Sequence, residues 1–311
     1  MRCRVCKGPI VIELRQHNAA FCEEHFLRFC RDQTARSIKK FDMFGTDDRI
    51  LVAVSGGKDS LALWDILLDL GYTADGLVLG LGIGEYSESS TEFARTFARD
   101  RDATLHEINL QESYRFDVPT AARETGRVPC SACGLSKRHL FDKTALELGY
   151  DVVVTGHNLD DEAAVLFGNT IRWKDDYLAR QAPVLPARAG FPRKAKPLVR
   201  LGEREMAAYC LLRGIDYIVE ECPMAEGNKH LEYKALLNEL ERTSPGAKMQ
   251  FYFGFLDRAA RHFEPEDAVE HLISACVRCG SPANGEVCSF CRLAERAAPV
   301  VLLPTRSGRD S

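Results

Sequence analysis

Short apolar runs alternate with amphipathic stretches along residues 48–222 of the chain. Strands are predicted near residues 50–54, 75–82, 104–109, 151–155 and 216–220. The stretches between them carry apolar residues at helical spacing near residues 59–70, 88–101, 134–149 and 159–170. Strands that alternate with helices are typical of a parallel sheet, because each helix returns the chain to the start of the next strand. We therefore expect an α/β fold with a doubly wound parallel sheet.

The remaining segments have other patterns. Residues 28–47 read as a basic helix that links into the sheet region. Residues 179–197 are rich in proline, alanine and basic residues and predict a long surface loop. Residues 223–270 predict a helical extension, with helices near 229–242 and 246–261.

Composition places the chain among ordinary globular proteins, with 45% hydrophobic and 28% charged residues in 311. No apolar run approaches the length of a membrane span, and the first residues lack the apolar core of a signal peptide. We therefore expect a cytoplasmic protein with no membrane partner. Because thiols stay reduced in the cytosol, the 12 cysteines are predicted to be metal ligands rather than disulfides.

The net charge of −4 argues against indiscriminate binding of nucleic acids, but the charge is unevenly distributed. Residues 172–200 carry eight basic side chains against only Asp175 and Asp176, and residues 28–40 carry a second basic group. Such patches suit a selective contact with a phosphate backbone. A solvated loop would have the same composition, so the first patch alone does not establish binding of a nucleic acid.

A glycine-rich turn follows the first predicted strand. Residues 55–60 read Ser-Gly-Gly-Lys-Asp-Ser, directly after the apolar run 50–54 and directly before a helical pattern. Gly56 and Gly57 let the backbone approach a phosphate closely, because they have no Cβ. The N-terminus of the helix that follows offers free N–H groups to an anion. The turn is therefore predicted to bind phosphate.

The side chains of this turn add chemistry. Ser55 and Ser60 provide hydroxyl donors, Lys58 is placed near the phosphates, and Asp59 is a natural ligand for Mg²⁺. The spacing differs from that of the Walker loop. It resembles the pyrophosphate loop (PP-loop) of ATP pyrophosphatases, which cleave ATP to AMP and pyrophosphate while they activate a substrate oxygen.

A second strand–turn–helix pattern spans residues 152–163. Asp160, Asp161 and Glu162 fall in the first turn of its helix, where the helix dipole favours carboxylates. That capping role is one explanation. A carboxylate at the carboxyl end of a strand, beside a triphosphate, is also where Mg²⁺ would be held.

Both ends of the chain, residues 1–27 and 271–294, carry four residues at metal-ligand spacing. The first set is Cys3, Cys6, Cys22 and His25. The second set is Cys276, Cys279, Cys288 and Cys291. Two such pairs complete a tetrahedron without an open position, which predicts two small zinc-finger modules with one structural Zn²⁺ each. Residues 295–311 follow as a predicted disordered tail.

A third group of thiols has no such simple pattern. Cys130 and Cys133 form a pair before a predicted helix, and Cys222 follows the predicted strand 216–220. If that strand ends at the carboxyl edge of the sheet, the three thiols meet beside the loop. They could hold an iron–sulfur cluster or form a persulfide relay. Alternatively, Cys222 is a buried packing residue and the pair is incidental; Cys30 and Cys210, in helical patterns, are interpreted as packing residues.

Four motifs together resemble the TtuA/TtcA family of tRNA thiolation enzymes. They are residues 55–60, 129–134, 156–162 and 221–223. The two terminal zinc sets are similar to the TtuA branch, the tRNA-5-methyluridine 2-sulfurtransferases. The resemblance extends from Met1 to about Arg292, and residues 172–195 are its least family-like stretch. It implies an adenine nucleotide alpha hydrolase-like fold of the PP-loop type.

The resemblance also implies a set of ligands and partners. The family holds a 4Fe-4S cluster on three cysteines, which match Cys130, Cys133 and Cys222. It binds ATP on the loop 55–60, and the pocket is completed by positions that match Ala53, Leu79, Gly156 and Asp161. Its sulfur comes from a ubiquitin-like carrier protein with a C-terminal thiocarboxylate. Its product is 2-thiouridine in tRNA, at position 54 in the TtuA branch.

The resemblance implies a mechanism in which the C2 oxygen of the uridine attacks the α-phosphate of ATP and sulfur then replaces AMP. Lys58 and the loop N–H groups would stabilise the phosphate charge, with Mg²⁺ on Asp59 or Asp161. Lys137, one helical turn past the cysteine pair, is placed to steady the α-phosphate or the leaving oxygen. Asp59, Lys137 and Asp161 are therefore the expected catalytic residues.

Several alternatives stay open. A related enzyme could make 2-thiouridine at position 34 or 2-thiocytidine, or could use a persulfide relay. An amidating or tRNA-lysidine-type enzyme would use the same loop but would not need the three thiols. A zinc-finger RNA-binding adaptor with a vestigial nucleotide site belongs to a different class, and the presence of Ser55, Asp59 and Asp161 argues against it. A homodimer is among the oligomeric states that the sequence allows.

Overall fold

The computed structural model describes residues 1–188, 190–225, 227, 229–263 and 273–298. Most of the expected disordered tail, residues 299–311, lies outside the described residues, as do residues 264–272 at the junction of the helical extension and the C-terminal module. Within the described ranges, no helix is both long and apolar enough to cross a membrane.

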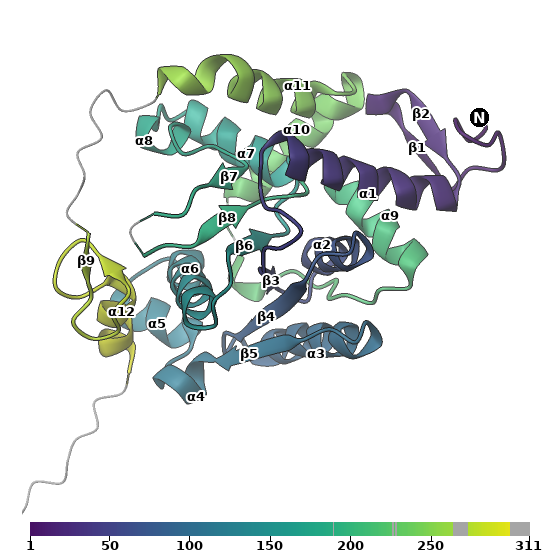
Figure 1. Cartoon of the computed structure of the whole chain (residues 1–311). Helices are drawn as coiled ribbons and strands as arrows, with labels where there is room; N and C mark the ends of the chain where they lie inside the picture. Colours follow the sequence, from purple (N-terminus) through teal and green to yellow (C-terminus); the bar gives the residue numbers. More distant parts are fainter. Residues whose placement is uncertain (189, 226, 228, 264–272, 299–311) are drawn as a thin grey trace, which may run out of the picture.

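A six-stranded sheet forms the centre of the molecule, with strand order β5-β4-β3-β6-β8-β7 (Figure 1). Its parallel strands are β3 (Ile50–Val54), β4 (Ala74–Gly80), β5 (Leu105–Asn109), β6 (Val152–Thr155) and β8 (Arg193–Ala195). The edge strand β7 (Val184–Leu185) is antiparallel to β8. The expected α/β class with a mostly parallel sheet is confirmed.

Alternate residues of β3 enter two separate cores, as expected for a strand that is buried on both faces. Ile50, Val52 and Val54 join one core, which also includes apolar residues of α1 (Glu23–Lys40), α2 (Lys58–Asp69), α3 (Gly84–Asp100), α7 (Leu159–Thr170) and α9 (Glu203–Arg213). Leu51 joins the other core with α4 (Leu110–Tyr114), α5 (Val118–Thr125), α6 (Pro129–Glu147) and α12 (Ser289–Ala297). Helices on both faces make the sheet doubly wound.

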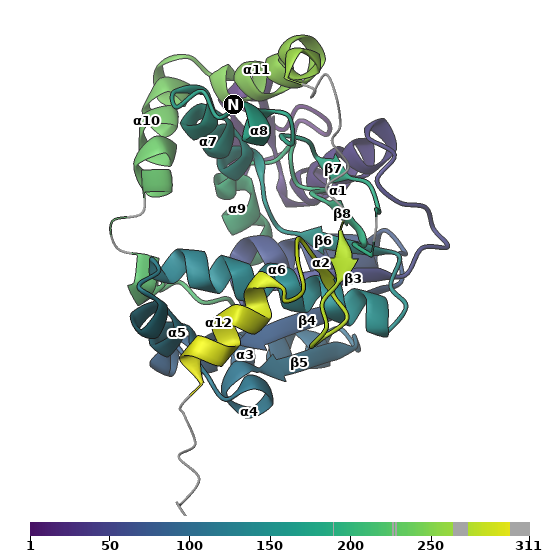
Figure 2. The same ribbon diagram turned by 90° about the vertical axis from the view of Figure 1, so that its left-hand side faces the viewer.

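The C-terminal helices are α10 (Lys229–Thr243) and α11 (Ala247–Gly254), which confirms two helices in the expected extension. Both contact α7. The N-terminal module contains the hairpin β1 (Ile12–Leu14) and β2 (Ala19–Phe21). The C-terminal module contains β9 (Ser274–Ala275), β10 (Pro282–Ala283) and α12, and Figure 2 shows α12 lying against α5 and α6.

The expected surface loop 179–197 is wrong in part, because it contributes β7 and β8 to the sheet. The basic side chains of this segment favoured the prediction of a solvated loop. The ammonium group of Lys194 lies 2.7 Å from Asp142, and that of Lys196 lies 2.8 Å from Glu162, and both carboxylates are buried. A strand next to β6 can therefore carry lysines, because buried carboxylates pair with them.

Two other expectations need correction. The expected strand near 216–220 does not form; the segment has no regular secondary structure, and the N–H of Ile218 donates to the carbonyl of Gly56 at 3.0 Å instead of joining a ladder. The helix expected over 134–149 begins earlier, at Pro129, because proline is favoured in the first turn of a helix. The pair Cys130 and Cys133 therefore lies inside the first turn of α6 and not before the helix. The short helix α8 (Asp175–Leu178) was not expected.

Candidate active site

The glycine-rich turn connects β3 to α2 and is clamped from two sides. Gly56 has φ of +71°, and a Cβ there would lie 2.2 Å from the carbonyl oxygen of Ser90 in α3. The Ser90 hydroxyl donates to the carbonyl of Ser55 at 2.6 Å. On the other side, Ile218 donates to Gly56. Only glycine fits between these two segments in this conformation.

The two serines of the turn hold its shape. Ser60 Oγ donates to the carbonyl of Gly57 at 3.0 Å and accepts from the N–H of Ser55 at 3.1 Å. The hydroxyls of Ser55 and Ser60 are 3.2 Å apart. Because α2 begins at Lys58, its first free N–H groups point out of this turn, as in other anion-binding helix termini.

Asp59 and Asp161, which come from separate strand–turn–helix units, are linked through one asparagine. The side-chain amide of Asn158 donates to Asp59 Oδ1 at 3.0 Å, and the backbone N–H of Asn158 donates to Asp161 Oδ2 at 3.1 Å. Lys58 Nζ lies 3.1 Å from Asp59. Burial raises the pKa of Asp59 to about 6 despite Lys58, and the nearby charge of Asp161 adds to the increase. Two carboxylates thus face one region beside the loop.

A lysine of the C-terminal extension occupies this region. Lys234 in α10 lies 2.6 Å from Asp161 and 2.6 Å from Glu203, and Lys58 is 3.9 Å from the same Glu203. Burial opposes ionisation of Asp161, but His230 and Lys234 outweigh it and hold the pKa of this carboxyl well below its usual range. Sequence analysis missed Lys234 and Glu203, because neither has a motif or lies near the loop in sequence.

The remaining predicted nucleotide-binding positions lie at the same edge of the sheet. Ala53 and Leu79 are each one residue before the carboxyl ends of β3 and β4. A Cβ at Gly156, just after β6, would lie 2.8 Å from the backbone N of Ser60 and from the carbonyl carbon of Asp59. Gly156 therefore lets the second strand–turn–helix unit pack directly on the first turn of α2.

The third group of thiols lies beside this edge. Cys130 Sγ donates to the carbonyl of Met224 at 3.5 Å, which ties the first turn of α6 to the segment that carries Cys222. Burial raises the pKa of Cys133; Lys137 opposes this, and the charges of Cys222 and Cys130 add to it. The thiols are therefore within electrostatic range of each other, and Lys137 is within range of Cys133. The three sulfurs are not all within 4.8 Å of one another.

The terminal clusters are tighter. In each, one ligand atom from every residue lies within 4.8 Å of the others, for Cys3, Cys6, Cys22 and His25 and for Cys276, Cys279, Cys288 and Cys291. The Sγ atoms of Cys6 and Cys22 are 3.7 Å apart, as are those of Cys279 and Cys288. Four ligands about 2.3 Å from a central Zn²⁺ have nearly this separation in a tetrahedron. Both sets therefore fit one tetrahedral ion.

Comparison with known proteins identifies the family. The chain is 50% identical over 293 residues to the tRNA-5-methyluridine(54) 2-sulfurtransferase of Thermus thermophilus, which covers 94% of this chain and 91% of the relative. It is 41% identical over 292 residues to the enzyme of the same name from Pyrococcus horikoshii, with 94% and 93% covered. The chain belongs to the family of tRNA-5-methyluridine(54) 2-sulfurtransferases. The expected resemblance to the TtuA branch is confirmed.

Two domain families agree with this 2-sulfurtransferase assignment. Residues 2–27 match the N-terminal LIM domain of 2-thiouridine synthetase TtuA, and residues 30–233 match the PP-loop domain. Among solved structures, the U34-tRNA thiolase NcsA from Methanococcus maripaludis with its 4Fe-4S cluster has a TM-score of 0.79 and 22% identity, covering 96% of this chain and 97% of its own. This likeness confirms the PP-loop fold.

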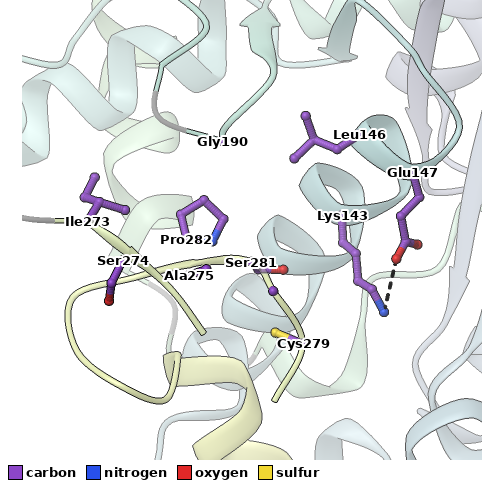
Figure 3. Close-up of a pocket in the computed structure, with 11 residues that line it drawn as sticks. Lys143, Leu146, Glu147, Gly190, Ile273, Ser274, Ala275, Cys279, Ser281 and Pro282 are labelled. Carbon is purple, nitrogen blue, oxygen red and sulfur yellow. Dashed lines mark ion pairs between the residues drawn. The ribbon is translucent and has the colours of Figure 1, made fainter. Parts of the chain in front are cut away.

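Two cavities border opposite ends of α6. One of about 680 Å³ lies at the first turn, and its lining includes Cys130, Arg172 and Tyr233. The other, of about 410 Å³, separates the last turns of α6 from the C-terminal module, where Lys143 pairs with Glu147 at 3.6 Å (Figure 3). Lys143 and Cys130 are about 20 Å apart along the helix, because an α-helix rises 1.5 Å per residue. Only the first cavity adjoins the candidate site.

Proposed function

We propose that the chain catalyses ATP-dependent thiolation of tRNA, in which sulfur replaces the C2 oxygen of 5-methyluridine or uridine at position 54. The observation that carries the proposal is that the segment carrying Cys222 contacts both the PP-loop, where Ile218 donates to Gly56, and the cysteine pair of α6, where Cys130 donates to Met224. The relatives named for position 54 match nearly the whole chain. An enzyme that only adenylates or amidates has no use for the thiols.

The loop 55–60 binds ATP in this proposal. Its N–H groups and Lys58 hold the phosphates, and Ala53, Leu79, Gly156 and Asp161 complete the pocket. The C2 oxygen of the uridine attacks the α-phosphorus, the bond to the β-phosphate oxygen breaks, and pyrophosphate leaves. A sulfur nucleophile then adds at C2, and AMP departs with the former C2 oxygen. Lys58 and Lys137 stabilise negative charge on the phosphates at both stages.

The carboxylates of Asp59 and Asp161 fit a Mg²⁺ ion, because oxygen ligands are those that this ion prefers. When bound, Mg²⁺ would neutralise charge on the phosphates. The chain prepares the position through Asn158, which holds both carboxylates, and through Lys234, whose ammonium group now balances Asp161. Lys234 must release Asp161 for a metal ion to bind there.

The thiols of Cys130, Cys133 and Cys222 fit a 4Fe-4S cluster better than a single ion. Unlike the two zinc sets, these three thiols do not all lie within 4.8 Å of one another, as expected when each sulfur binds a different iron. Cys130 is exposed and faces the cavity of about 680 Å³, so one side of the group is open. When bound, the cluster would supply an iron without a protein ligand for the incoming sulfur. The chain supplies the three ligands, and Lys137 beside them.

The same proposal assigns the rest of the chain. The catalytic domain spans residues 48–222, and the modules 1–27 and 271–294 each hold one structural Zn²⁺. The sulfur donor is a ubiquitin-like carrier protein with a C-terminal thiocarboxylate. The basic linker of residues 28–47, in which helix α1 ends at Lys40, and the helical extension 223–270 connect these parts, and a homodimer is compatible with the assignment.

Cells that lack the protein and three variants of the full chain test the proposal. Mapping of thiolated nucleosides in tRNA from cells that lack the protein should show loss of 2-thiolation at position 54. Cys222→Ala should lose the visible absorption of an anaerobically reconstituted cluster, whereas Cys30→Ala, a buried cysteine in α1, should keep it. Asp59→Ala should abolish thiolation with the absorption intact. Full absorption in Cys222→Ala would exclude the ligand assignment, and activity in iron-free protein would favour the persulfide relay.

A further inference from the structure

Two aromatic rings stand out on the surface near the candidate site. Among the large hydrophobic side chains exposed in the described part of the chain, only Trp173 and Tyr177 are aromatic, with 71% and 64% of their surface exposed. The other tryptophan of the chain, Trp64, is completely buried. An exposed indole forgoes the stabilisation that burial would give, so its position requires an explanation.

The segment that carries these rings is firmly held. Trp173 has φ of +47°, an unusual conformation for a bulky residue, and its N–H donates to the carbonyl of Thr170 at 3.1 Å. After α8 begins, Leu178 is 1% exposed, and the buried Gln181 donates to Glu162 at 3.0 Å. The rings are therefore exposed because an ordered backbone presents them to solvent.

Basic residues flank the two rings in sequence. Arg172, Lys174 and Arg180 are all exposed, against Asp175 and Asp176 in the first turn of α8. We refer to Trp173, Tyr177 and these three basic residues as the aromatic platform.

The guanidinium group of Arg172 is fixed beside the candidate site. It donates to the hydroxyl of Tyr233 at 3.0 Å and lies 5.7 Å from the centre of that ring. Arg172 and Tyr233 also line the cavity of about 680 Å³ that contains Cys130. The aromatic platform therefore continues directly from the rim of this cavity.

We propose that Trp173 and Tyr177 stack against unpaired bases of the tRNA substrate while Arg172, Lys174 and Arg180 contact its phosphates. Aromatic rings interleaved with cations are the features that bind unstacked RNA, because every base has a π-face and every nucleotide a negative charge. A base can be modified at C2 only after it leaves its stack, so a platform beside the site would hold the displaced nucleotides. This inference rests on the proposed function.

Intrinsic fluorescence of the cluster-free, zinc-loaded protein tests the inference directly. Acrylamide quenches exposed indoles, and Trp64 is buried, so the quenchable emission comes from Trp173. Saturating tRNA should abolish this quenching. A neutral quencher is needed, since the phosphates of RNA would repel iodide and mimic protection.

Affinity for unmodified tRNA provides the second measurement. Trp173→Ala should weaken binding by about 5- to 150-fold, the range found when one stacking ring is removed. Trp173→Phe should keep most of the affinity, and Leu211→Ala, which removes a hydrophobic side chain that is 79% exposed on α9, should leave it unchanged. Binding of ATP should be unaffected in all three variants.

The outcomes separate this inference from the proposed function. If the wild-type chain binds tRNA and the affinity of Trp173→Ala for tRNA is within twofold of the wild-type affinity, the aromatic platform does not bind tRNA and the proposed function stands. If a ubiquitin-like carrier protein protects Trp173 from acrylamide and tRNA does not, the surface binds a protein partner. If the wild-type chain does not bind tRNA, both the inference and the proposed function are overturned.

Discussion

Gly56 is the position in the PP-loop where a single methyl group should have the largest effect. Its φ of +71° lies in the left-handed region, and a Cβ would lie 2.2 Å from the carbonyl oxygen of Ser90 and 2.9 Å from Ser90 Cα. The obstacle is backbone within α3, which cannot rotate away as a side chain would. Gly56→Ala must therefore move either the loop or the helix.

The expected cost has two parts. Alanine in the left-handed region costs about 1–2 kcal/mol, and relief of the overlap with Ser90 costs about 1–3 kcal/mol more. The free energy of unfolding should therefore fall by about 3 kcal/mol. Gly57→Ala is the matched control, because Gly57 has φ of −86° and the nearest atom to its Cβ would be Ser55 Oγ at 3.4 Å. Its effect on stability should be within about 0.5 kcal/mol.

Urea denaturation of the zinc-loaded chain measures both variants against the wild type, and calorimetric titration with ATP reports the loop itself. Gly56→Ala should lower the urea midpoint and lose ATP binding. A Gly56→Ala protein with the midpoint of Gly57→Ala would refute the reasoning, because it would mean that α3 does not constrain the loop.

Three further predictions concern charges and metal. Lys234→Ala should lower the free energy of unfolding by about 2 kcal/mol, because it removes the ammonium group shared by Asp161 and Glu203 and leaves the more distant His230, 3.8 Å from Asp161, and Lys58, 3.9 Å from Glu203; urea denaturation measures this, and Lys234→Arg should recover most of it. Burial lowers the pKa of His139 to about 4. The neutral, buried His139 therefore contributes fully to the free energy of unfolding above pH 6.5, and this contribution is lost as the pH falls toward 4. His139→Phe, which keeps the stacking on Phe290, should reduce the loss of stability between pH 7 and pH 5 by up to about 2 kcal/mol, seen as a smaller shift of the urea midpoint. Cys288→Ser should release one of two zinc ions, measured by a colorimetric chelator, and a variant that keeps both would exclude Cys288 as a ligand.

Features that depend on neighbours in sequence could be predicted well. The strand β3, the turn at residues 55–60 and α2 follow from one apolar run, two glycines and one helical pattern within twenty residues. The residues of the two terminal clusters could be grouped for the same reason, because each Cys-x-x-Cys or Cys-x-x-His pair is a local geometry.

Features that depend on distant partners were missed. Strand β8 looked like a solvated loop because its lysines gave no sign of the buried carboxylates of Asp142 and Glu162 that pair with them. Lys234 belongs to a helix that was expected, but its contact with Asp161 is set by how α10 packs on α7. Periodicity identifies a helix face and does not identify what that face meets.

The segment around residues 216–222 explains why sequence spacing alone could not show whether Cys130, Cys133 and Cys222 form one functional group. The sequence shows an apolar run there, and an apolar run predicts a strand. In the sheet β8 lies beside β6, so this run stays outside the sheet and Ile218 donates a hydrogen bond to Gly56. Four residues later the same backbone reaches Cys222, and Met224 then accepts from Cys130. One segment thus contacts both the PP-loop and the cysteine pair of α6, so the two halves of the candidate site are positioned by the same backbone. A displacement of the loop should therefore be transmitted to Cys222, which local sequence spacing could not reveal.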